Sequence, residues 1–342
     1  FTGLQDLDFY STCTQEFVRD VCTYWIGTFG IDGIRFDNTV NYNIPGDPQG
    51  IPDLLDDIHA YLDERNITNF SLTLEHLSMD AISLVNSTRA TSYWDNSLYQ
   101  KTFDALWNGS LDPSMLDTLN NQRFLSDPSN APTLYLSNHD HSHVAWQAGA
   151  RDNRGGFEWY RTQPYAIALF TSPGVPLIRA GEEFAEDHWI PEDDAGTGRR
   201  VRQRPLRWKL ADDQVGLTVW RLYARLAAIR QQYPGLRSVN FYPDHWDGSQ
   251  TTFNSAGFGV DTSRQVMLFH RWGPSASGAL QRFYIVVNFS AEPRWVTVPF
   301  PENGPWTDLL ANFDGSWTPI VSDYHLDLQV SSNWGHVFFR EG

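Results

Sequence analysis

Gly33-Ile-Arg-Phe-Asp37 and Leu72-Thr-Leu-Glu75 are two short, mostly apolar stretches that each end at a carboxylate. A third stretch of the same form, Leu136-Ser-Asn-His-Asp140, follows later in the chain. In a (β/α)8 barrel the active site lies at the carboxyl ends of the strands, so these acidic residues would meet in one cleft. Because a glycosidase needs a pair of carboxylates, the pattern predicts an enzyme that breaks or remakes a glycosidic bond.

The composition is that of a globular protein large enough for two domains. The chain has 342 residues, of which 41% are hydrophobic, and no apolar run approaches the length of a membrane span. The formal net charge of −16 disfavours nucleic acids and anionic membranes as partners and suits a neutral substrate. No charged segment followed by an apolar segment opens the chain, so we expect no signal peptide.

Two cysteines and five glycosylation sequons give little functional information. Cys13 and Cys22 fall on one predicted helix, where nine residues correspond to roughly 13 Å, too far for a disulfide. We therefore expect free thiols, with Cys22 buried. The Asn-x-Ser/Thr sequons permit glycosylation without demonstrating secretion, and they begin at Asn66, Asn69, Asn86, Asn108 and Asn288.

Strand and helix patterns alternate along the first two thirds of the chain. The first predicted helix has capping-box spacing in Thr12 and Gln15, an apolar stripe from Phe17 to Phe29, and Gly30 at its end. Strands are expected at 31–37, 71–75, 90–94, 133–138 and 175–180, and further helices near 52–64, 79–86, 98–107, 164–171 and 215–232.

This alternation predicts a parallel sheet covered by helices. Beyond Pro234 the pattern changes to short alternating segments separated by Gly, Pro, Ser and Asn, which predicts an antiparallel β domain from about residue 237. A closed barrel needs eight strands, and five precede the β domain. Two interpretations are open: a smaller open sheet, or a barrel whose first three β/α units are not in this chain.

The quoted stretches resemble motifs of the α-amylase family of glycoside hydrolases (family 13). Gly33-Ile-Arg-Phe-Asp37 is similar to its fourth-strand motif, Gly-x-Arg-x-Asp, and Glu75 ends the next strand. Ser137-Asn-His-Asp140 matches the seventh-strand motif, and Gly174-Val-Pro-Leu-Ile-Arg-Ala-Gly-Glu-Glu183 is similar to the eighth-strand segment. Each motif is weak alone, but four in order across residues 3–240 are specific.

The resemblance implies roles for five residues. Asp37 is the expected nucleophile, Glu75 the general acid/base, and Asp140 the residue that holds and distorts the substrate. His139 and Arg35 are expected to bind substrate. The implied function is a retaining glycoside hydrolase acting on α-1,4-linked glucans such as starch or maltooligosaccharides. The alternatives are a transglycosylase of the same family or, against the intact carboxylate set, a non-catalytic carbohydrate-binding relative.

The resemblance also implies that the chain carries part of a catalytic domain. Residues 1–236 correspond to strands four to eight of the (β/α)8 barrel, and residues 237–342 to an antiparallel β-sandwich domain. The first three strands, an inserted domain and an Asn-His motif have no equivalent here. We expect this missing N-terminal part to exist as a separate or cleaved chain, a partner of this one.

Two departures from the family pattern concern ligands. Val40 and Asn41 stand where members that act on starch often carry Lys-His, so the acceptor-side contacts and a calcium ligand often donated there are absent at these positions. His143 stands where many members have Arg, which argues against a chloride site. The chemistry itself requires no cofactor, while the family allows a structural calcium ion.

The residues themselves support the assignment of the two carboxylates. Arg35 lies two positions before Asp37, so both side chains point to the same side of the strand, and an adjacent cation favours an ionised carboxylate. Glu75 follows apolar residues, and partial desolvation would raise its pKa toward the working pH, as a general acid requires. Asp140 would accept hydrogen bonds from sugar hydroxyls.

Each motif has a structural alternative when it is taken alone. An Asp at a strand end is more often a helix cap, His139-Asp140 a structural hydrogen bond, and Arg35-Asp37 a buried ion pair. Their occurrence together favours catalysis. For the adjacent acids Glu182 and Glu183 a structural role is favoured. Candidate sugar platforms are Tyr93, Trp94, Trp146 and Trp159, and the cluster Arg199, Arg200, Arg202 and Arg204 is expected to be solvated or ion-paired.

Overall fold

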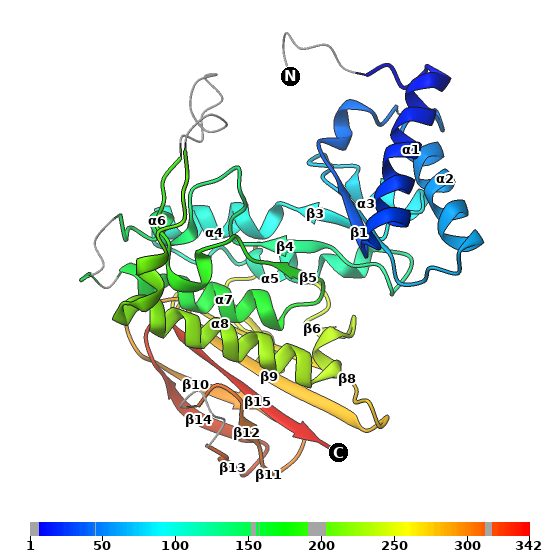
Figure 1. Cartoon of the computed structure of the whole chain (residues 1–342). Coiled ribbons are helices and arrows are strands. Elements are labelled where there is room, and N and C mark those ends of the chain that lie inside the picture. The colour runs from blue at the N-terminus through cyan, green and yellow to red at the C-terminus, as the bar shows by residue number, and fades with distance from the viewer. Residues whose placement is uncertain (1–6, 45, 152–154, 157, 191–202, 312–316) are drawn as a thin grey trace. The chain divides into compact units, whose positions relative to one another are not determined.

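The computed structural model describes residues 7–44, 46–151, 155–156, 158–190, 203–311 and 317–342. The chain divides into two compact units. The first contains Phe1–Asp95 and Gln122–Thr133, and the second contains Asn96–Asn121 and Leu134–Gly342. Each unit is described below by itself, with the elements labelled as in Figure 1.

The first unit carries three parallel strands and their connecting helices. β1 pairs with β2 from Gly33↔Ser71 to Phe36↔Leu74, and β2 pairs with β3. This register places the residues that follow β1 and β2, Asp37 and Glu75, at the same edge of the sheet. The elements are α1 (Thr12–Phe29), β1 (Gly33–Phe36), η1 (Thr39–Asn41), α2 (Ile51–Glu64), β2 (Ser71–Leu74), α3 (Ala81–Ser87) and β3 (Ser92–Asp95).

The apolar face of α2 forms the centre of the core of the first unit. Ile51, Leu54, Leu55, Ile58 and Leu62 are all buried there, together with Leu72 and Leu74 of β2. This one-sided burial is what the spacing of the apolar residues predicts. Cys22 is also buried and Cys13 exposed, both as free thiols, as predicted.

Helix α1 differs from its prediction in two ways. Ser11, not Thr12, is the N-cap residue and makes no side-chain cap bond; the Gln15 side chain donates instead to the carbonyl of Phe9. The predicted capping box is therefore wrong, because Gln15 finds a partner outside the helix. The apolar stripe is present, but only Cys22 and Ile26 are buried in α1. Phe17, Val21, Tyr24, Trp25 and Phe29 are exposed.

The second unit continues the alternation and adds the antiparallel domain. The strand order of the parallel sheet follows the chain, β1-β2-β3-β4-β5, which confirms the predicted parallel α/β sheet. Helix α7 is apolar and all nine of its residues are buried, because α8 and strands β9 and β15 pack against it. The elements are α4 (Ser97–Asn108), α5 (Met115–Thr118), β4 (Thr133–Tyr135), α6 (Val144–Gln147), η3 (Glu158–Thr162), α7 (Gln163–Thr171), β5 (Val175–Leu177), η4 (Glu182–Phe184), η5 (Trp208–Asp212), α8 (Gln214–Gln232) and η6 (Pro234–Arg237). A further short element, η2 (Asn121–Phe124), belongs to the first unit except for Asn121.

An antiparallel β domain follows, as predicted (Figure 1). Its main sheet has the order β12-β15-β9-β8-β6, with β7 also paired to β8, and β10 pairs with β14. Trp306, Phe338 and Tyr284 lie in its core. The strands are β6 (Phe241–Tyr242), β7 (Gly259–Asp261), β8 (Val266–Pro274), β9 (Leu280–Asn288), β10 (Arg294–Pro299), β11 (Gly304–Pro305), β12 (Thr307–Asp308), β13 (Ile320–Val321), β14 (His325–Val330) and β15 (Trp334–Glu341).

Two buried arginines hold backbone carbonyls within the second unit. The Arg271 guanidinium is fully buried and donates to the carbonyls of Thr171 (2.5 Å), Ser238 (2.6 Å) and Leu236 (3.0 Å). Arg230 donates to the carbonyl of Ser172 (2.8 Å), and burial lowers its pKa to about 10. The bonds to Thr171 and Ser172 satisfy carbonyls at the carboxyl end of α7, which have no partner within the helix, and the other two hold the segment after α8.

Two further properties concern the surface. Among the described residues, no helix is both long and apolar enough to cross a membrane. Of the five sequons, the one at Asn288 is closed to glycosylation. Its side chain is completely buried, and its amide donates to the carbonyls of Glu292, Val330 and Ser331.

Candidate active site

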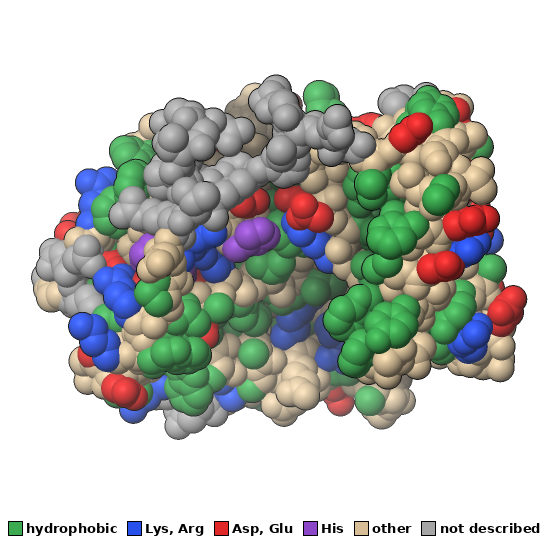
Figure 2. Space-filling view, turned by 45° about the horizontal axis from the view of Figure 1, so that its top comes forward, with side chains coloured by type: hydrophobic (Ala, Val, Ile, Leu, Met, Phe, Trp, Pro, Cys, Tyr) green, Lys and Arg blue, Asp and Glu red, His purple; other side chains and the backbone are tan. Residues whose placement is uncertain are grey.

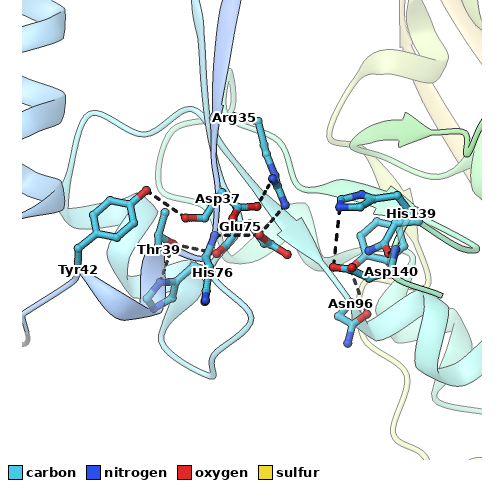
Figure 3. Close-up of polar contacts among 12 residues, drawn as sticks. Arg35, Asp37, Thr39, Tyr42, Glu75, His76, Asn96, His139 and Asp140 are labelled. Carbon is cyan, nitrogen blue, oxygen red and sulfur yellow. Dashed lines mark hydrogen bonds and ion pairs between the residues drawn. The ribbon is translucent and has the colours of Figure 1, made fainter. Parts of the chain in front are cut away.

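One arginine joins the two predicted catalytic carboxylates. Asp37 and Glu75 follow the paired residues Phe36 and Leu74, and the amide of Glu75 donates to the carbonyl of Phe36 (2.9 Å). Arg35 Nη1 lies 2.5 Å from Asp37 Oδ1, and Arg35 Nη2 lies 2.5 Å from Glu75 Oε2 (Figure 3). The contact to Glu75 is an ion pair without hydrogen-bond alignment. The strand pairing thus brings the three charged groups together.

The two carboxylates differ sharply in exposure. The side chain of Asp37 is 69% exposed, whereas that of Glu75 is 8% exposed. Burial raises the pKa of Glu75; the Asn38 amide and Arg35 oppose this, and the charge of Asp37 adds to it. A raised pKa favours the protonated form, which a general acid needs. An accessible carboxylate beside a buried one provides different environments for two different roles.

The turn after β1 binds both the side-chain carboxylate and the backbone carbonyl of Glu75. Asn38 adopts the left-handed conformation (φ 44°, ψ 52°), and its amide donates to Glu75 Oε2 (2.8 Å). Thr39 donates to the backbone carbonyl of Glu75 from its amide (2.9 Å) and its hydroxyl (3.0 Å). Sequence analysis missed both residues. The available signal was the Asn directly after Asp37, because Asn tolerates this conformation better than most residues.

His139 and Asp140 lie in the second unit, in the turn that follows β4. The amide of Asp140 donates to Asn138 Oδ1 (2.9 Å), and His139 Nε2 lies 3.9 Å from Asp140 Oδ2. The His139 side chain is 59% exposed and that of Asp140 29% exposed. Both are accessible to a ligand. Their convergence with Asp37 and Glu75, which belong to the first unit, stays a prediction.

Comparison with known proteins gives structural matches only. No protein-family model matches the chain, and no curated protein matches it in sequence. An α-amylase from Anoxybacillus matches 99% of this chain with a TM-score of 0.68 at 19% identity. An α-amylase from H. orenii matches 100% of it with a TM-score of 0.69 at 17% identity. The chain has part of the α-amylase fold.

The same matches show how much of each solved structure this chain covers. It spans 65% of the Anoxybacillus α-amylase and 67% of the H. orenii enzyme. CldA, a cyclomaltodextrin glucanotransferase with a three-domain arrangement, is covered to 62%, with a TM-score of 0.70 at 18% identity. The resemblance to family 13 is thus confirmed for a partial domain. Which strands of the α-amylase barrel are present stays a prediction.

Three of the four aromatic residues considered as sugar platforms are buried: Tyr93, Trp94 and Trp159. A buried ring has no open face for a sugar, so of the four candidates Trp146 remains. Trp94 instead packs against Arg35. The Arg35 guanidinium lies over its ring, 4.2 Å from the centroid, and this cation–π contact orients the arginine that joins the two carboxylates.

Glu182 has the contacts of a structural residue. Its carboxyl accepts hydrogen bonds from Ser137 (2.9 Å) and from the Tyr223 hydroxyl (3.0 Å), and burial raises its pKa to about 7. It thereby joins the segment after β4 to α8. The neighbouring Glu183 accepts from the amide of Gly181 (2.9 Å). The favoured structural interpretation of both acids agrees with these contacts.

The remaining candidates concern ions. Arg199, Arg200 and Arg202 lie outside the described residues, and Arg204 donates to the carbonyl of His139. Within the described part of the chain, no group of three or more His, Cys, Asp or Glu side chains is placed to hold a metal ion. A structural calcium ion, which the family allows, stays a prediction, because calcium also binds backbone and Asn carbonyl oxygens.

Proposed function

We propose that this chain carries the catalytic carboxylates of a retaining glycoside hydrolase that acts on α-1,4-linked glucans such as starch or maltooligosaccharides. One observation carries the proposal. A single arginine contacts an accessible Asp and a buried Glu whose pKa is raised, at the ends of adjacent parallel strands. The similarity to solved α-amylases supports the same reaction class.

In the proposed mechanism Asp37 attacks the anomeric carbon and Glu75 protonates the departing glycosidic oxygen. A covalent glycosyl-enzyme forms on Asp37; Glu75 then removes a proton from water, which releases the sugar with its configuration retained. Retention requires carboxyl groups about 5–5.5 Å apart, a distance that suits two groups bound to one guanidinium. The carboxylates perform this chemistry without a cofactor. His139 and Asp140 are proposed to bind the sugar at this bond.

The anomeric configuration of the first product tests this proposal. Maltoheptaose cleaved by the protein should give the α anomer before mutarotation, as measured by proton NMR during the first minutes. Release of the β anomer would contradict a covalent intermediate on Asp37. Binding of maltoheptaose without any product would favour the non-catalytic alternative.

A transglycosylase is the second candidate, because CldA, a glucanotransferase, shares the fold. Both reactions use the same glycosyl-enzyme and differ in whether water or a sugar accepts the glycosyl group. A product analysis of maltoheptaose turnover with and without added glucose distinguishes them. Hydrolysis should yield shorter products in both cases, whereas transfer should yield glucose-terminated products longer than those of the control.

We also propose that residues 1–236 supply strands four to eight of the barrel and that a further polypeptide segment supplies the first three. In the described residues β1 pairs with β2 alone, so its other edge has no hydrogen-bonded strand, although an exposed edge is unusual for a parallel strand. The exposed face of α1 carries Tyr24, Trp25 and Phe29, with the rings of Trp25 and Phe29 stacked at 4.7 Å. Figure 2 shows hydrophobic side chains gathered on the side where α1 lies in Figure 1.

A face of this kind marks a contact surface rather than a solvated one. The proposed segment adds a parallel strand to β1 and a helix to α1, which fits the third of the matched α-amylases that this chain does not span. Native protein should therefore contain additional α/β sequence, as shown by intact mass and N-terminal sequencing. If the 342-residue chain alone is monomeric, cooperative in unfolding and fully active, this proposal is wrong.

A further inference from the structure

His76 lies between the candidate acid/base and a second carboxylate. It follows Glu75 directly and is 2% exposed. Its Nδ1 lies 2.9 Å from the Thr39 hydroxyl oxygen (Figure 3). Its Nε2 lies 3.0 Å from Asp80 Oδ1. Both ring nitrogens therefore have a polar partner. A buried imidazole with two such partners is held in one orientation.

The hydrogen-bond donors in this group can be assigned by counting protons. The Glu75 carbonyl can only accept, so the single hydroxyl proton of Thr39 goes to it (3.0 Å). The Thr39 oxygen then accepts from His76 Nδ1. Hydrogen bonds from Ser78 and His76 lower the pKa of Asp80, as expected for a carboxylate that accepts from Nε2. The Thr39 hydroxyl thus contacts both the Glu75 carbonyl and the His76 ring.

This chain of bonds ends at the turn that holds Glu75. Thr39 binds the backbone of Glu75, and the preceding residue, Asn38, binds its carboxylate through the amide. A shift of Thr39 would therefore move the Asn38 amide away from the Glu75 carboxylate. His76, itself in contact with Asp80, contacts the same Thr39 hydroxyl that donates to the Glu75 carbonyl.

We infer that His76 is a positioning residue for the acid/base Glu75, acting through Thr39 and anchored by Asp80. This inference rests on the proposed glycosidase function. His76 does not touch the reacting atoms. It keeps the turn 38–39 in the arrangement in which one backbone amide meets the Glu75 carboxylate and Thr39 meets its carbonyl.

Comparing substrates that need an acid with substrates that do not tests the inference. Cleavage of maltoheptaose needs proton donation to the leaving group, whereas maltosyl fluoride does not, and azide can attack the glycosyl-enzyme without a base. His76→Leu should lower kcat on maltoheptaose about 10-fold or more. With maltosyl fluoride and azide together, the same variant should stay within about 3-fold of the wild type.

Two further variants complete the experiment. His76→Asn retains a donor near the Nδ1 position and should recover a large part of the maltoheptaose rate. His59 forms the same kind of i,i+4 pair with Asp63 (3.1 Å) on α2, away from Glu75, so His59→Leu is the matched control and should change neither rate.

The outcomes separate this inference from the proposed function. Equal losses of His76→Leu on both substrates, or no loss on either, would overturn the positioning role while the wild-type activity stands. A wild-type protein that contains the additional segment and turns over neither substrate would instead refute the proposed function.

Discussion

Glu75 and Glu182 are both buried acids near the carboxyl ends of parallel strands, and burial raises the pKa of both. Their partners differ. Glu75 meets a guanidinium and a backbone amide, beside the accessible Asp37. Glu182 is bonded to the hydroxyls of Ser137 and Tyr223. Burial and a raised pKa therefore do not distinguish the two acids; the proposed catalytic role of Glu75 rests on the accessible second carboxylate and the shared cation.

The largest effect is expected at Asp37. Asp37→Asn removes the nucleophile but keeps the size of the side chain, so kcat on maltoheptaose should fall on the order of 10⁴-fold or more. The midpoint of thermal unfolding should change little, because the side chain is 69% exposed. Steady-state kinetics and calorimetry check both. A near-normal rate would show that Asp37 is not the nucleophile, and the accessible carboxylate would then no longer distinguish Glu75 from Glu182.

Glu75→Gln comes next. Loss of the acid/base should reduce kcat on maltoheptaose by about 10²–10⁴-fold. Substrates with good leaving groups, such as maltosyl fluoride, should recover much of the glycosylation rate because they need no proton. The burst of fluoride release measures this step directly. If both substrates lose the same factor, Glu75 does not act as the acid.

Glu182 should affect stability rather than chemistry. Folding raises the pKa of Glu182 from 4.5 to about 7. The protonated side chain therefore contributes fully to the free energy of unfolding below pH 4.5, and this contribution is lost as the pH rises toward 7. Glu182→Gln cannot ionise and keeps one carbonyl acceptor; its NH2 group only donates, so one of the two hydroxyls must accept from it. Between pH 4.5 and pH 7 the free energy of unfolding of the variant, relative to that of the wild type, should therefore increase by an amount on the order of 3 kcal/mol.

Urea unfolding at several pH values measures this difference. The kcat of Glu182→Gln on maltoheptaose should remain within about 3-fold of the wild type, in contrast with Glu75→Gln. A parallel pH dependence for variant and wild type would show that Glu182 is ionised in the folded protein. The two carboxyls would then differ less than their contacts suggest.

The smallest effect is expected from Tyr223→Phe. This change removes one hydrogen bond to Glu182 (3.0 Å) and leaves the ring in place, so it should cost about 1–2 kcal/mol of unfolding free energy. The cost should be smaller at low pH, because a hydrogen bond to the protonated, neutral Glu182 is weaker than one to its carboxylate. A larger effect on kcat than on stability would give Glu182 a part in the chemistry.

Local sequence patterns predicted the order of the elements well. Apolar runs and their periodicity indicated the parallel strands, helix α2 and the antiparallel domain, since these patterns depend on neighbours in the chain. They could not predict that α1 leaves Trp25 and Phe29 exposed, because periodicity shows which face is apolar and not what covers it. Gln15 likewise bonds to Phe9 outside the helix and not within a capping box.

The candidate site was predicted only in part for a similar reason. Asp37 and Glu75 carry charge at strand ends, which is visible in the sequence. The contacts of Thr39 and His76 with each other and with Glu75 depend on the register of β1 against β2 and on the left-handed Asn38 between them. Such bonds join residues 36 or 37 positions apart, and no local pattern encodes them.

The fully buried Arg271 has a consequence for the evolution of this architecture. It lies on β8 of the antiparallel domain, yet it donates to the last carbonyl of α7 and to three carbonyls of the segment between α8 and β6. A gene rearrangement that exchanged or deleted this domain would leave those carbonyls without donors inside an apolar environment. The domain is therefore not an interchangeable module, and recombination near residue 237 should be tolerated only between sequences that both keep this arginine.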